Sequence, residues 1–385
     1  MSRLSSQLLP FLSKNKRIVL KIGSRVIASR KQGLDQEKIK SIATEVAALR
    51  GAGYFLFIVS SGAILAGTEK LGFQKRPMTL PMKQAAASVG QSRLIWAYEK
   101  IFESFNIKVA QVLLTGEDVA DRKRFINARN TLMTLLSYDV LPIINENDTV
   151  SVDEIKFGDN DRLAAQVAYL IDAALLILMT DIDGLYTADP RKNRDATMIP
   201  VVTEITHEIE AMAGGASSTG GGTGGMISKI VTAKQMAANG VATLILNGTK
   251  PGQLRHALLG ERGEIGTLFL PKPIRPASKK QWIAYSSKTK GAITLDAGAV
   301  KAIQKGGKSL LPSGVCSVTG KFAVGDAIRC LSPDGVEVAV GLTNYGAPEM
   351  IQLIGAHSSE IQKKLGHKSQ DEVIHRDNMV IHRGR

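Results

Sequence analysis

The chain has 385 residues, which is too long for one ordinary hydrophobic core and predicts two or three domains. Hydrophobic residues make up 44% of it and charged residues 22%, as in globular proteins. No apolar stretch reaches the length of about 18 residues that a membrane span requires, and the N-terminus lacks the apolar region of a secretory signal, so we expect a cytoplasmic protein.

The formal net charge is +14, of which +11 falls in residues 1–288. A basic excess suits nucleic acid, an anionic membrane surface or small anionic substrates. Solvated surface lysines are the simplest explanation for most of it, so charge alone leaves the class of partner open.

Residues 17–270 alternate short apolar runs with longer helical patterns. The predicted strands are Ile18–Lys21, Phe55–Val59, Val109–Leu113, Val140–Ile144, Leu175–Met179 and Thr243–Leu246. The predicted helices are Gln36–Arg50, Lys83–Phe105, Ala128–Ser137, Leu163–Ile171 and Ile227–Asn239. Strands that are apolar throughout and separated by helices indicate a largely parallel sheet covered on both faces. Ligands of such sheets bind in the loops beyond the carboxyl ends of the strands.

The C-terminal part has a different pattern. We expect a linker at 271–288, a small β-rich domain at 289–370 and a tail at 371–385, and a mobile N-terminal extension at 1–16. The β-rich domain has the strand candidates Ala292–Leu295, Gly314–Val318, Ala327–Leu331 and Glu337–Leu342, with Asp334-Gly335 as a hairpin turn. Its two cysteines, Cys316 and Cys330, lie in strand-like sequence without zinc-ligand spacing, so we expect buried free thiols.

Polar and glycine residues gather where four predicted strands end. These ends lead into Lys21-Ile-Gly-Ser, Ser60-Ser-Gly-Ala, Asn145-Glu-Asn-Asp and Thr180-Asp-Ile-Asp-Gly. Ordinary turn preferences explain any one of these loops. Four of them in one sheet favour a shared site.

A glycine-rich run at 214–225 precedes a predicted helix, where free backbone N–H groups suit a phosphate. It lacks the spacing of the common phosphate-binding and dinucleotide-binding loops, and a flexible linker is the simpler reading of glycines alone. Lys229 just inside that helix, and Lys21 at the end of an apolar strand, favour phosphoryl transfer, in which charge neutralisation and positioning dominate.

Seven acidic and amide residues lie close together in sequence, at Asn145, Glu146, Asn147, Asp148, Asp159, Asn160 and Asp161. Carboxylates of this kind hold Mg²⁺ or a substrate amine, and amides donate to a substrate carboxylate. Asp161 is equally well placed as a helix N-cap. The few histidines form no hydrolase-like arrangement.

The motifs VLKIGSRV, IVSSGAILAG, KQAAASVGQSRL, RKRFINARNTL, PIINENDTV, IKFGDNDRLAA, LMTDIDGLYTADPR and GTGGMISK, in that order, closely resemble the glutamate 5-kinase family of the amino-acid kinase superfamily. The segment LLPSGVCSVTGKFAVGD resembles the PUA domain that many members carry. The resemblance implies a three-layer α/β/α sandwich with a mostly parallel sheet, and ATP-dependent phosphorylation of L-glutamate at its γ-carboxylate as the first step of proline biosynthesis. It further implies use of Mg²⁺, feedback inhibition by proline and homo-oligomers.

Carried onto matching positions, the resemblance implies that Lys21 and Lys229 stabilise the transferred phosphoryl group and that Asp161 orients them. The residues implied for glutamate are Ser61, Asp148 and Asn160. Those implied for ATP are Lys21, Gly23, Thr180, Asp181, Thr223, Gly224, Gly225, Met226, Ile227, Ser228 and Lys229. No side chain is expected to ligate Mg²⁺ directly, since the ion would arrive with ATP.

Arg25 stands where the family pattern leads us to expect a small hydroxyl residue, so it either alters the phosphate loop or points outward. Two alternatives remain open. One is a related carboxylate kinase, such as one for acetylglutamate. The other is RNA binding by the PUA-like domain, against which its slight basic charge and few aromatic residues speak.

Overall fold

We analysed a computed structural model that describes residues 3–29, 33–73, 77, 79–151, 160–215, 225–260, 265–271, 289–368 and 370–381. The chain forms two compact units. Unit 1 comprises Met1–Asp118 with Ile126–Arg275, and unit 2 comprises Val119–Phe125 with Pro276–Arg385. No helix within these ranges is long and apolar enough to cross a membrane.

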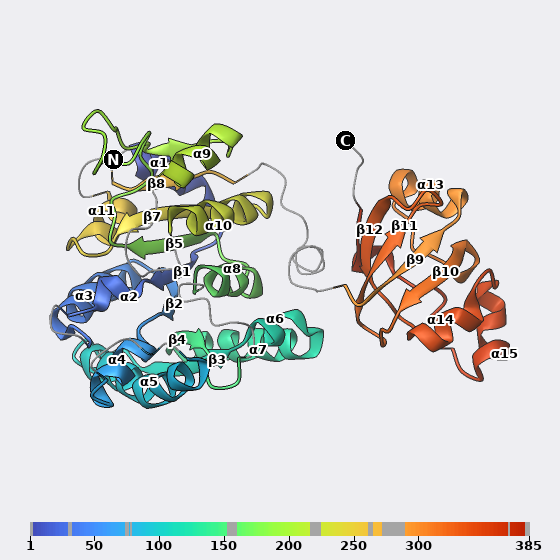
Figure 1. Ribbon diagram of the computed structural model, residues 1–385, viewed down its shortest axis with the longest axis horizontal. Coiled ribbons are helices and arrows are strands. Elements are labelled where there is room, and N and C mark those ends of the chain that lie inside the picture. The colour runs from blue at the N-terminus through green and yellow to red at the C-terminus, as the bar shows by residue number, and fades with distance from the viewer. Residues whose placement is uncertain are drawn as a thin grey trace. The chain divides into compact units, whose positions relative to one another are not determined.

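Unit 1 is built on an eight-stranded sheet of order β3-β4-β2-β1-β5-β7-β8-β6 (Figure 1). Neighbouring strands are parallel except for the antiparallel pair β7 and β8. The strands are β1 (Arg17–Ile22), β2 (Phe55–Ser60), β3 (Val109–Leu114), β4 (Leu141–Glu146), β5 (Leu175–Thr180), β6 (Val201–Val202), β7 (Ala242–Asn247) and β8 (Thr267–Phe269). The six strands predicted from sequence are confirmed, each to within two residues.

Helices cover both faces of this sheet (Figure 1). They are α1 (Arg3–Leu12), α2 (Ser24–Ile27), α3 (Gln36–Gly51), α4 (Ala63–Lys70), α5 (Leu80–Glu103), α6 (Gly116–Ala120), α7 (Arg122–Ser137), α8 (Asn160–Leu170), α9 (His207–Gly215), α10 (Met226–Ala238) and α11 (Gln253–Leu259). α3, α5 and α11 share one apolar core with the sheet, whereas α8 and α10 contact each other and the sheet from the opposite face. The predicted three-layer α/β/α sandwich is therefore confirmed.

The N-terminal residues differ from the expectation of a mobile extension. Residues 3–12 form α1, in which Leu8 and Leu12 are buried next to Ala257 and Leu258 of α11. Leucines four positions apart lie on one face of a helix, so this short segment carries an apolar stripe that it buries in the core.

Unit 2 contains a five-stranded sheet of order β10-β9-β11-β12-β13. Its elements are β9 (Gly291–Leu295), α13 (Ala297–Gly306), η1 (Pro312–Gly314), β10 (Val315–Gly320), β11 (Ala327–Leu331), β12 (Glu337–Leu342), α14 (Ala347–Leu353), η2 (Ser358–Glu360), α15 (Ile361–Leu365), η3 (Arg376–Asn378) and β13 (Met379–Ile381). The predicted hairpin joins β11 and β12, and Gly335 takes the positive φ of 78° that such a turn requires. Residues 371–385 were expected to form a tail outside the β-rich domain. Part of this segment instead forms β13, which pairs with β12 as an edge strand of the sheet.

The two cysteines have different environments. Cys330 is fully buried in the core of unit 2, which raises the pKa of its thiol to about 12. Cys316 is a free but exposed thiol on β10. The prediction of two buried thiols is therefore wrong for Cys316, because strand-like sequence does not reveal which face a side chain takes.

Candidate active site

The carboxyl end of β1 directs one lysine toward the α8 side of the sheet. Ile18, Leu20 and Ile22 belong to the apolar core shared with α3 and α5. Because alternate side chains of a strand point to opposite faces, Lys21 points away from that core. Only 5% of Lys21 is exposed, so its ammonium group requires a buried partner.

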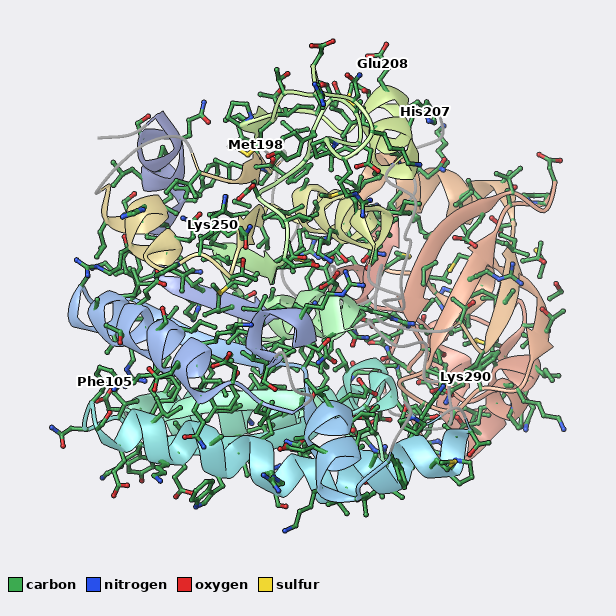
Figure 2. All side chains as sticks on the ribbon, turned by 60° about the vertical axis from the view of Figure 1, so that its left-hand side comes forward. Phe105, Met198, His207, Glu208, Lys250 and Lys290 are labelled. Carbon is green, nitrogen blue, oxygen red and sulfur yellow. The ribbon has the colours of Figure 1, made fainter. Side chains whose placement is uncertain are left out.

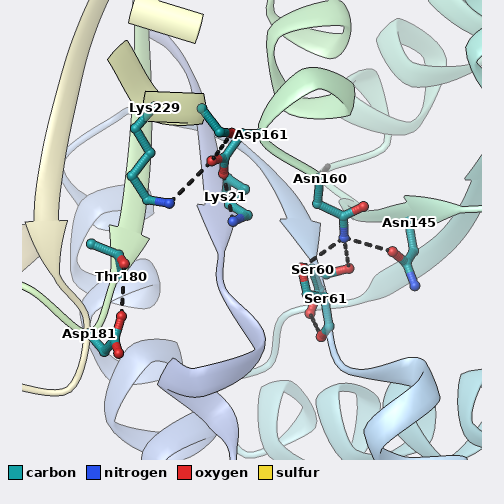
Figure 3. A network of polar contacts seen from close by, with 10 residues as sticks. Lys21, Ser60, Ser61, Asn145, Asn160, Asp161, Thr180, Asp181 and Lys229 are labelled. Atoms are coloured by element: carbon teal, nitrogen blue, oxygen red, sulfur yellow. Dashed lines mark hydrogen bonds and ion pairs between the residues drawn. The ribbon is translucent and has the colours of Figure 1, made fainter. Parts of the chain in front are cut away.

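That partner is Asp161, in the first turn of α8 and completely buried. Its Oδ1 lies 2.6 Å from Nζ of Lys21, and its Oδ2 lies 3.2 Å from Nζ of Lys229 in α10 (Figure 3). Ser228 donates its hydroxyl to the same Oδ2 at 3.1 Å. One carboxylate thus holds together two lysines that are separated by more than 200 residues in sequence. The N-cap role considered for Asp161 is wrong, since the helix begins at Asn160 and the carboxylate faces the lysines.

The charges of these three residues depend on one another. Burial by itself raises the pKa of Asp161, but the charges and hydrogen bonds of both lysines outweigh burial and hold the pKa of the carboxyl below its usual value. Burial, aided by repulsion from Lys21, lowers the pKa of Lys229 against the attraction of Asp161. The three ionised side chains carry a net charge of +1, held in a largely dry environment.

Backbone groups next to the lysines are open to a ligand. Gly225 is the N-cap of α10. Among the residues that the structure describes, no side chain caps this helix end, and no atom lies within 4 Å of a Cβ built at Gly225. A Cβ on Gly23, after β1, would lie 3.1 Å from the carbonyl of Met179 and 3.8 Å from Nζ of Lys21. Glycine therefore keeps side-chain atoms out of the space beside Lys21. Free N–H groups and ammonium groups are the donors that phosphate oxygens need.

The loop after β5 lies beside the phosphate-loop residues that follow β1. Thr180 donates its hydroxyl to Asp181 at 3.1 Å, and Arg25 pairs with Asp181 at 2.9 Å. Burial by itself raises the pKa of Asp181, but the hydrogen bond and charge of Arg25 outweigh burial and lower this pKa. Arg25 therefore does not simply point outward. It joins the two loops that the sequence associates with the nucleotide.

A second polar pair lies at the exits of β5 and β7. Asp183 contacts Lys250 and accepts a hydrogen bond from Asn247 at 3.1 Å. Lys250 lies just beyond the end of β7 (Figure 2). These residues were not singled out in the sequence. The contact ties the two strand exits together.

Amide groups occupy the exits of β2 and β4. Nδ2 of Asn160 donates to the carbonyl of Ser60 at 3.0 Å, to Oγ of Ser61 at 2.9 Å and to Oδ1 of Asn145 at 3.0 Å (Figure 3). Asn145 in turn donates to Gln91 of α5 at 2.8 Å. Burial raises the pKa of Asp148, in the loop after β4, to about 6.

The structure brings most of the predicted site residues to one edge of the sheet. Lys21, Asp161 and Lys229 meet directly. Asn160 donates a hydrogen bond to Ser61 and directly precedes Asp161 in the chain, so the lysine cluster and the amide cluster are adjacent. Thr223, Gly224 and Asp159 lie outside the described residues. Gln91 lies in the motif KQAAASVGQSRL, but it was given no role, because a glutamine within a long helix shows no sign of its partner in the sequence.

This arrangement can neutralise an anion with two ammonium groups next to a set of amide and carboxylate acceptors. Within the ranges that the structure describes, no group of three or more His, Cys, Asp and Glu side chains is placed to hold a metal ion. The donors that the described residues offer an anionic ligand here include lysine, hydroxyl and backbone N–H groups.

Comparisons with known proteins agree with the two units. The model of the amino acid kinase family matches residues 16–247, and that of the PUA domain matches residues 291–365. A protein named glutamate 5-kinase from Geobacter sulfurreducens is 53% identical over 370 residues, which is 96% of this chain and 98% of that protein. The glutamate 5-kinase of Carboxydothermus hydrogenoformans is 49% identical over 371 residues, with the same coverage. Among solved structures, a UMP kinase from Bacillus anthracis aligns with a TM-score of 0.45 and 15% identity, over 66% of this chain and 96% of that one.

Proposed function

The chain belongs to the amino acid kinase family, and from that premise we propose that it transfers the γ-phosphoryl group of ATP to the γ-carboxylate of L-glutamate, the activity for which its relatives are named. The product is L-glutamyl 5-phosphate, with which proline biosynthesis begins. The observation that carries the proposal is the meeting of Lys21 and Lys229 on Asp161, one residue from Asn160.

The acceptor needs no general base. A carboxylate with an ordinary pKa of about 4.3 is ionised and nucleophilic at neutral pH. The difficulty is repulsion between this anion and the phosphate oxygens. A site of lysines, N–H groups and amides without histidine suits that task.

We assign the two lysines to the phosphoryl group in transit. Each ammonium group contacts one oxygen of Asp161, and an ammonium group has three N–H donors with which to bind both a carboxylate and phosphate oxygens. Asp161 stays ionised because both lysines hold its pKa low, and in return it limits the repulsion between them. Asp161 is thus a positioning residue, while Lys21 and Lys229 are the catalytic cations.

The nucleotide would be held by the α10 N-terminus, Gly23 and the Thr180–Asp181 loop. Gly23 and Gly225 leave room for phosphate groups near the two lysines, so the residues present fit ATP. Mg²⁺, arriving with ATP, would supply further charge neutralisation at the phosphate oxygens.

Glutamate would lie beside Ser61, Asp148 and Asn160. The carboxylate of Asp148 suits a free α-ammonium group, and an N-acetylated substrate would leave that charge unpaired. This favours glutamate over acetylglutamate. Inhibition by proline, assembly into homo-oligomers and a cytoplasmic location belong to the proposal as expectations from the family resemblance.

A coupled assay of ADP release tests the function. We expect turnover with ATP and L-glutamate, little with N-acetylglutamate, and lower turnover when proline is added. Activity on N-acetylglutamate alone would refute the substrate assignment. Unchanged turnover with proline present would refute the expected feedback inhibition but would not affect the proposal of kinase activity.

A further inference from the structure

A chain of amide hydrogen bonds runs from helix α5 to Asn160. Oε1 of Gln91 accepts from Nδ2 of Asn145 at 2.8 Å, and Oδ1 of Asn145 accepts from Nδ2 of Asn160 at 3.0 Å. The chain ends where Nδ2 of Asn160 donates to the backbone carbonyl of Ser60 at 3.0 Å. Of the residues in this series of hydrogen bonds, Asn160 alone belongs to the proposed glutamate site.

The direction of every bond in this chain follows from its last acceptor. A backbone carbonyl only accepts hydrogen bonds, so Asn160 must turn its NH₂ group toward Ser60. Asn145 must then present its oxygen to Asn160 and its NH₂ group to Gln91. Gln91 must then accept that hydrogen bond with its side-chain oxygen. The orientation of the three amides is therefore set by chemistry and not by the choice between similar N and O positions.

Both ends of the chain are held firmly. A Cβ added at Gly90, the residue before Gln91, would lie 1.7 Å from the carbonyl of Ala63 in α4, so the two helix backbones are in direct contact. Ser60 is fully buried, and its hydroxyl lies 2.9 Å from that of Tyr98 in α5. Helix α5 cannot shift toward or away from the amides without disrupting this packing.

The middle of the chain is buried. Only 3% of Asn145 is exposed. If Gln91 could not accept, the NH₂ group of Asn145 would lose its partner in a place that water scarcely reaches, which is costly. The amide of Asn145 would gain by rotating toward other groups, and Asn160 would lose one of its three acceptors, keeping Ser60 and Ser61.

We propose that Gln91 is a positioning residue for glutamate, acting through Asn145. Together with Ser60 and Ser61, it holds Asn160 with the NH₂ group turned inward, so that the group offered to the substrate is the carbonyl oxygen Oδ1. A carbonyl oxygen is an acceptor for the α-ammonium group of the amino acid. The inference rests on the proposed function, because it assigns Asn160 to glutamate.

The test compares Gln91→Met, which keeps the length but cannot accept strongly, with Gln91→Glu, which keeps the acceptor. Gln91→Asn keeps the amide but is one methylene too short, and serves as a second disruptive variant should Gln91→Met not fold. Gln84→Met is the matched control, because Gln84 lies seven residues earlier on α5 and donates only a 3.4 Å bond to the carbonyl of Ser151. Steady-state kinetics with each substrate and calorimetric titration with glutamate provide the readouts.

We expect Gln91→Met and Gln91→Asn to raise the glutamate KM and Kd roughly tenfold, as the loss of one buried hydrogen bond predicts. The ATP KM should change less than about twofold, and Gln91→Glu should restore glutamate binding. A general loss of folding would affect both substrates and is reported by the melting temperature.

Unchanged glutamate KM in both disruptive variants, or an equal rise in Gln84→Met, would overturn the inference. So would a tenfold rise in Gln91→Glu. Failure of the proposed function is a separate result, since it appears as a wild-type protein that does not use glutamate.

Discussion

Replacing Asp161 with asparagine removes the charge on which two buried lysines depend. The side chains of Lys21 and Lys229 are only 6% and 4% exposed, and that of Asp161 is not exposed at all. Removing one partner from a buried ion pair costs about 3–5 kcal/mol. The variant has two cations left without their anion, so we expect a loss at the upper end of that range.

The loss has a ceiling, because one lysine can give up its proton. The ordinary lysine pKa of about 10.4 lies about 2.9 units above pH 7.5, and each unit corresponds to about 1.36 kcal/mol. Neutralising one lysine at pH 7.5 therefore costs about 4 kcal/mol. We expect Asp161→Asn to be destabilised by about 4 kcal/mol, with one lysine neutral.

This mechanism has a characteristic dependence on pH. A lysine that is neutral in the folded variant and protonated in the unfolded chain makes the unfolded state bind one more proton, so stability rises with pH. From pH 7.5 to 9.5 the deficit of Asp161→Asn relative to the wild type should shrink by up to about 2.7 kcal/mol. Above about pH 10.4 the unfolded lysine loses its proton as well, and no further recovery is expected.

Urea unfolding at several pH values measures the deficit. The control is Asp172→Asn, which removes a more exposed ion pair with Arg129, 2.8 Å long, and should cost less than about 1 kcal/mol. A deficit for Asp161→Asn no larger than that of the control, or one that does not vary with pH, would refute the reasoning that a single carboxylate balances two buried cations.

Three further predictions concern activity. Lys229→Ala should lower kcat by about 10²–10³-fold without unfolding the protein. Lys234→Ala is the control, because Lys234 lies on the same helix but is exposed and paired with Glu210, and it should leave kcat nearly unchanged. Equal kcat in the two variants would contradict the role of Lys229. Burial raises the pKa of Asp148 to about 6, so its negative charge is lost as pH falls below that value. Below pH 6, kcat/KM for glutamate should therefore drop about tenfold per pH unit. A kcat/KM that does not change from pH 5 to 7 would show that Asp148 does not bind glutamate. Arg25→Ser should raise the ATP KM several-fold, and more at low salt than at high salt, since Arg25 is a half-exposed cation beside the proposed nucleotide loop. An ATP KM equal to that of the wild type at low salt would show that Arg25 pairs with Asp181 but does not contribute to ATP binding.

The sheet could be predicted because its strands are apolar on both faces. Runs such as Leu175–Met179 are bounded by polar loops and have the length of strands, so their ends were found to within a residue or two. The two shortest strands, β6 and β8, were missed. Segments of two and three residues carry no periodicity to recognise.

Helix α4 was missed for a different reason. Its small residues allow its backbone to meet that of α5, and a Cβ at Gly67 would lie 1.7 Å from the carbonyl of Ala86. Glycine and alanine at such positions resemble loop sequence when the partner helix is not visible. Only the packing shows why they are small.

The meeting of the two lysines could be anticipated from the sheet topology, because the loops after parallel strands gather at one edge. The residues by themselves do not identify their shared partner, since Asp161 fits an N-cap equally well, and only the family resemblance implied that it orients the lysines. Gln91 lies in a family motif but could not be given a role, because its contact with Asn145 joins residues 54 positions apart.

The most direct test of the central claim is the capture of the acyl phosphate product. Hydroxylamine converts an acyl phosphate to a hydroxamate, so the rate of glutamyl hydroxamate formation from ATP and L-glutamate reports the transfer itself. We predict rapid formation by the wild type and a rate at least 100-fold lower in folded Lys21→Ala and Lys229→Ala variants. Hydroxamate formation at the wild-type rate in either folded variant would contradict the assignment of that ammonium group to the transferred phosphoryl.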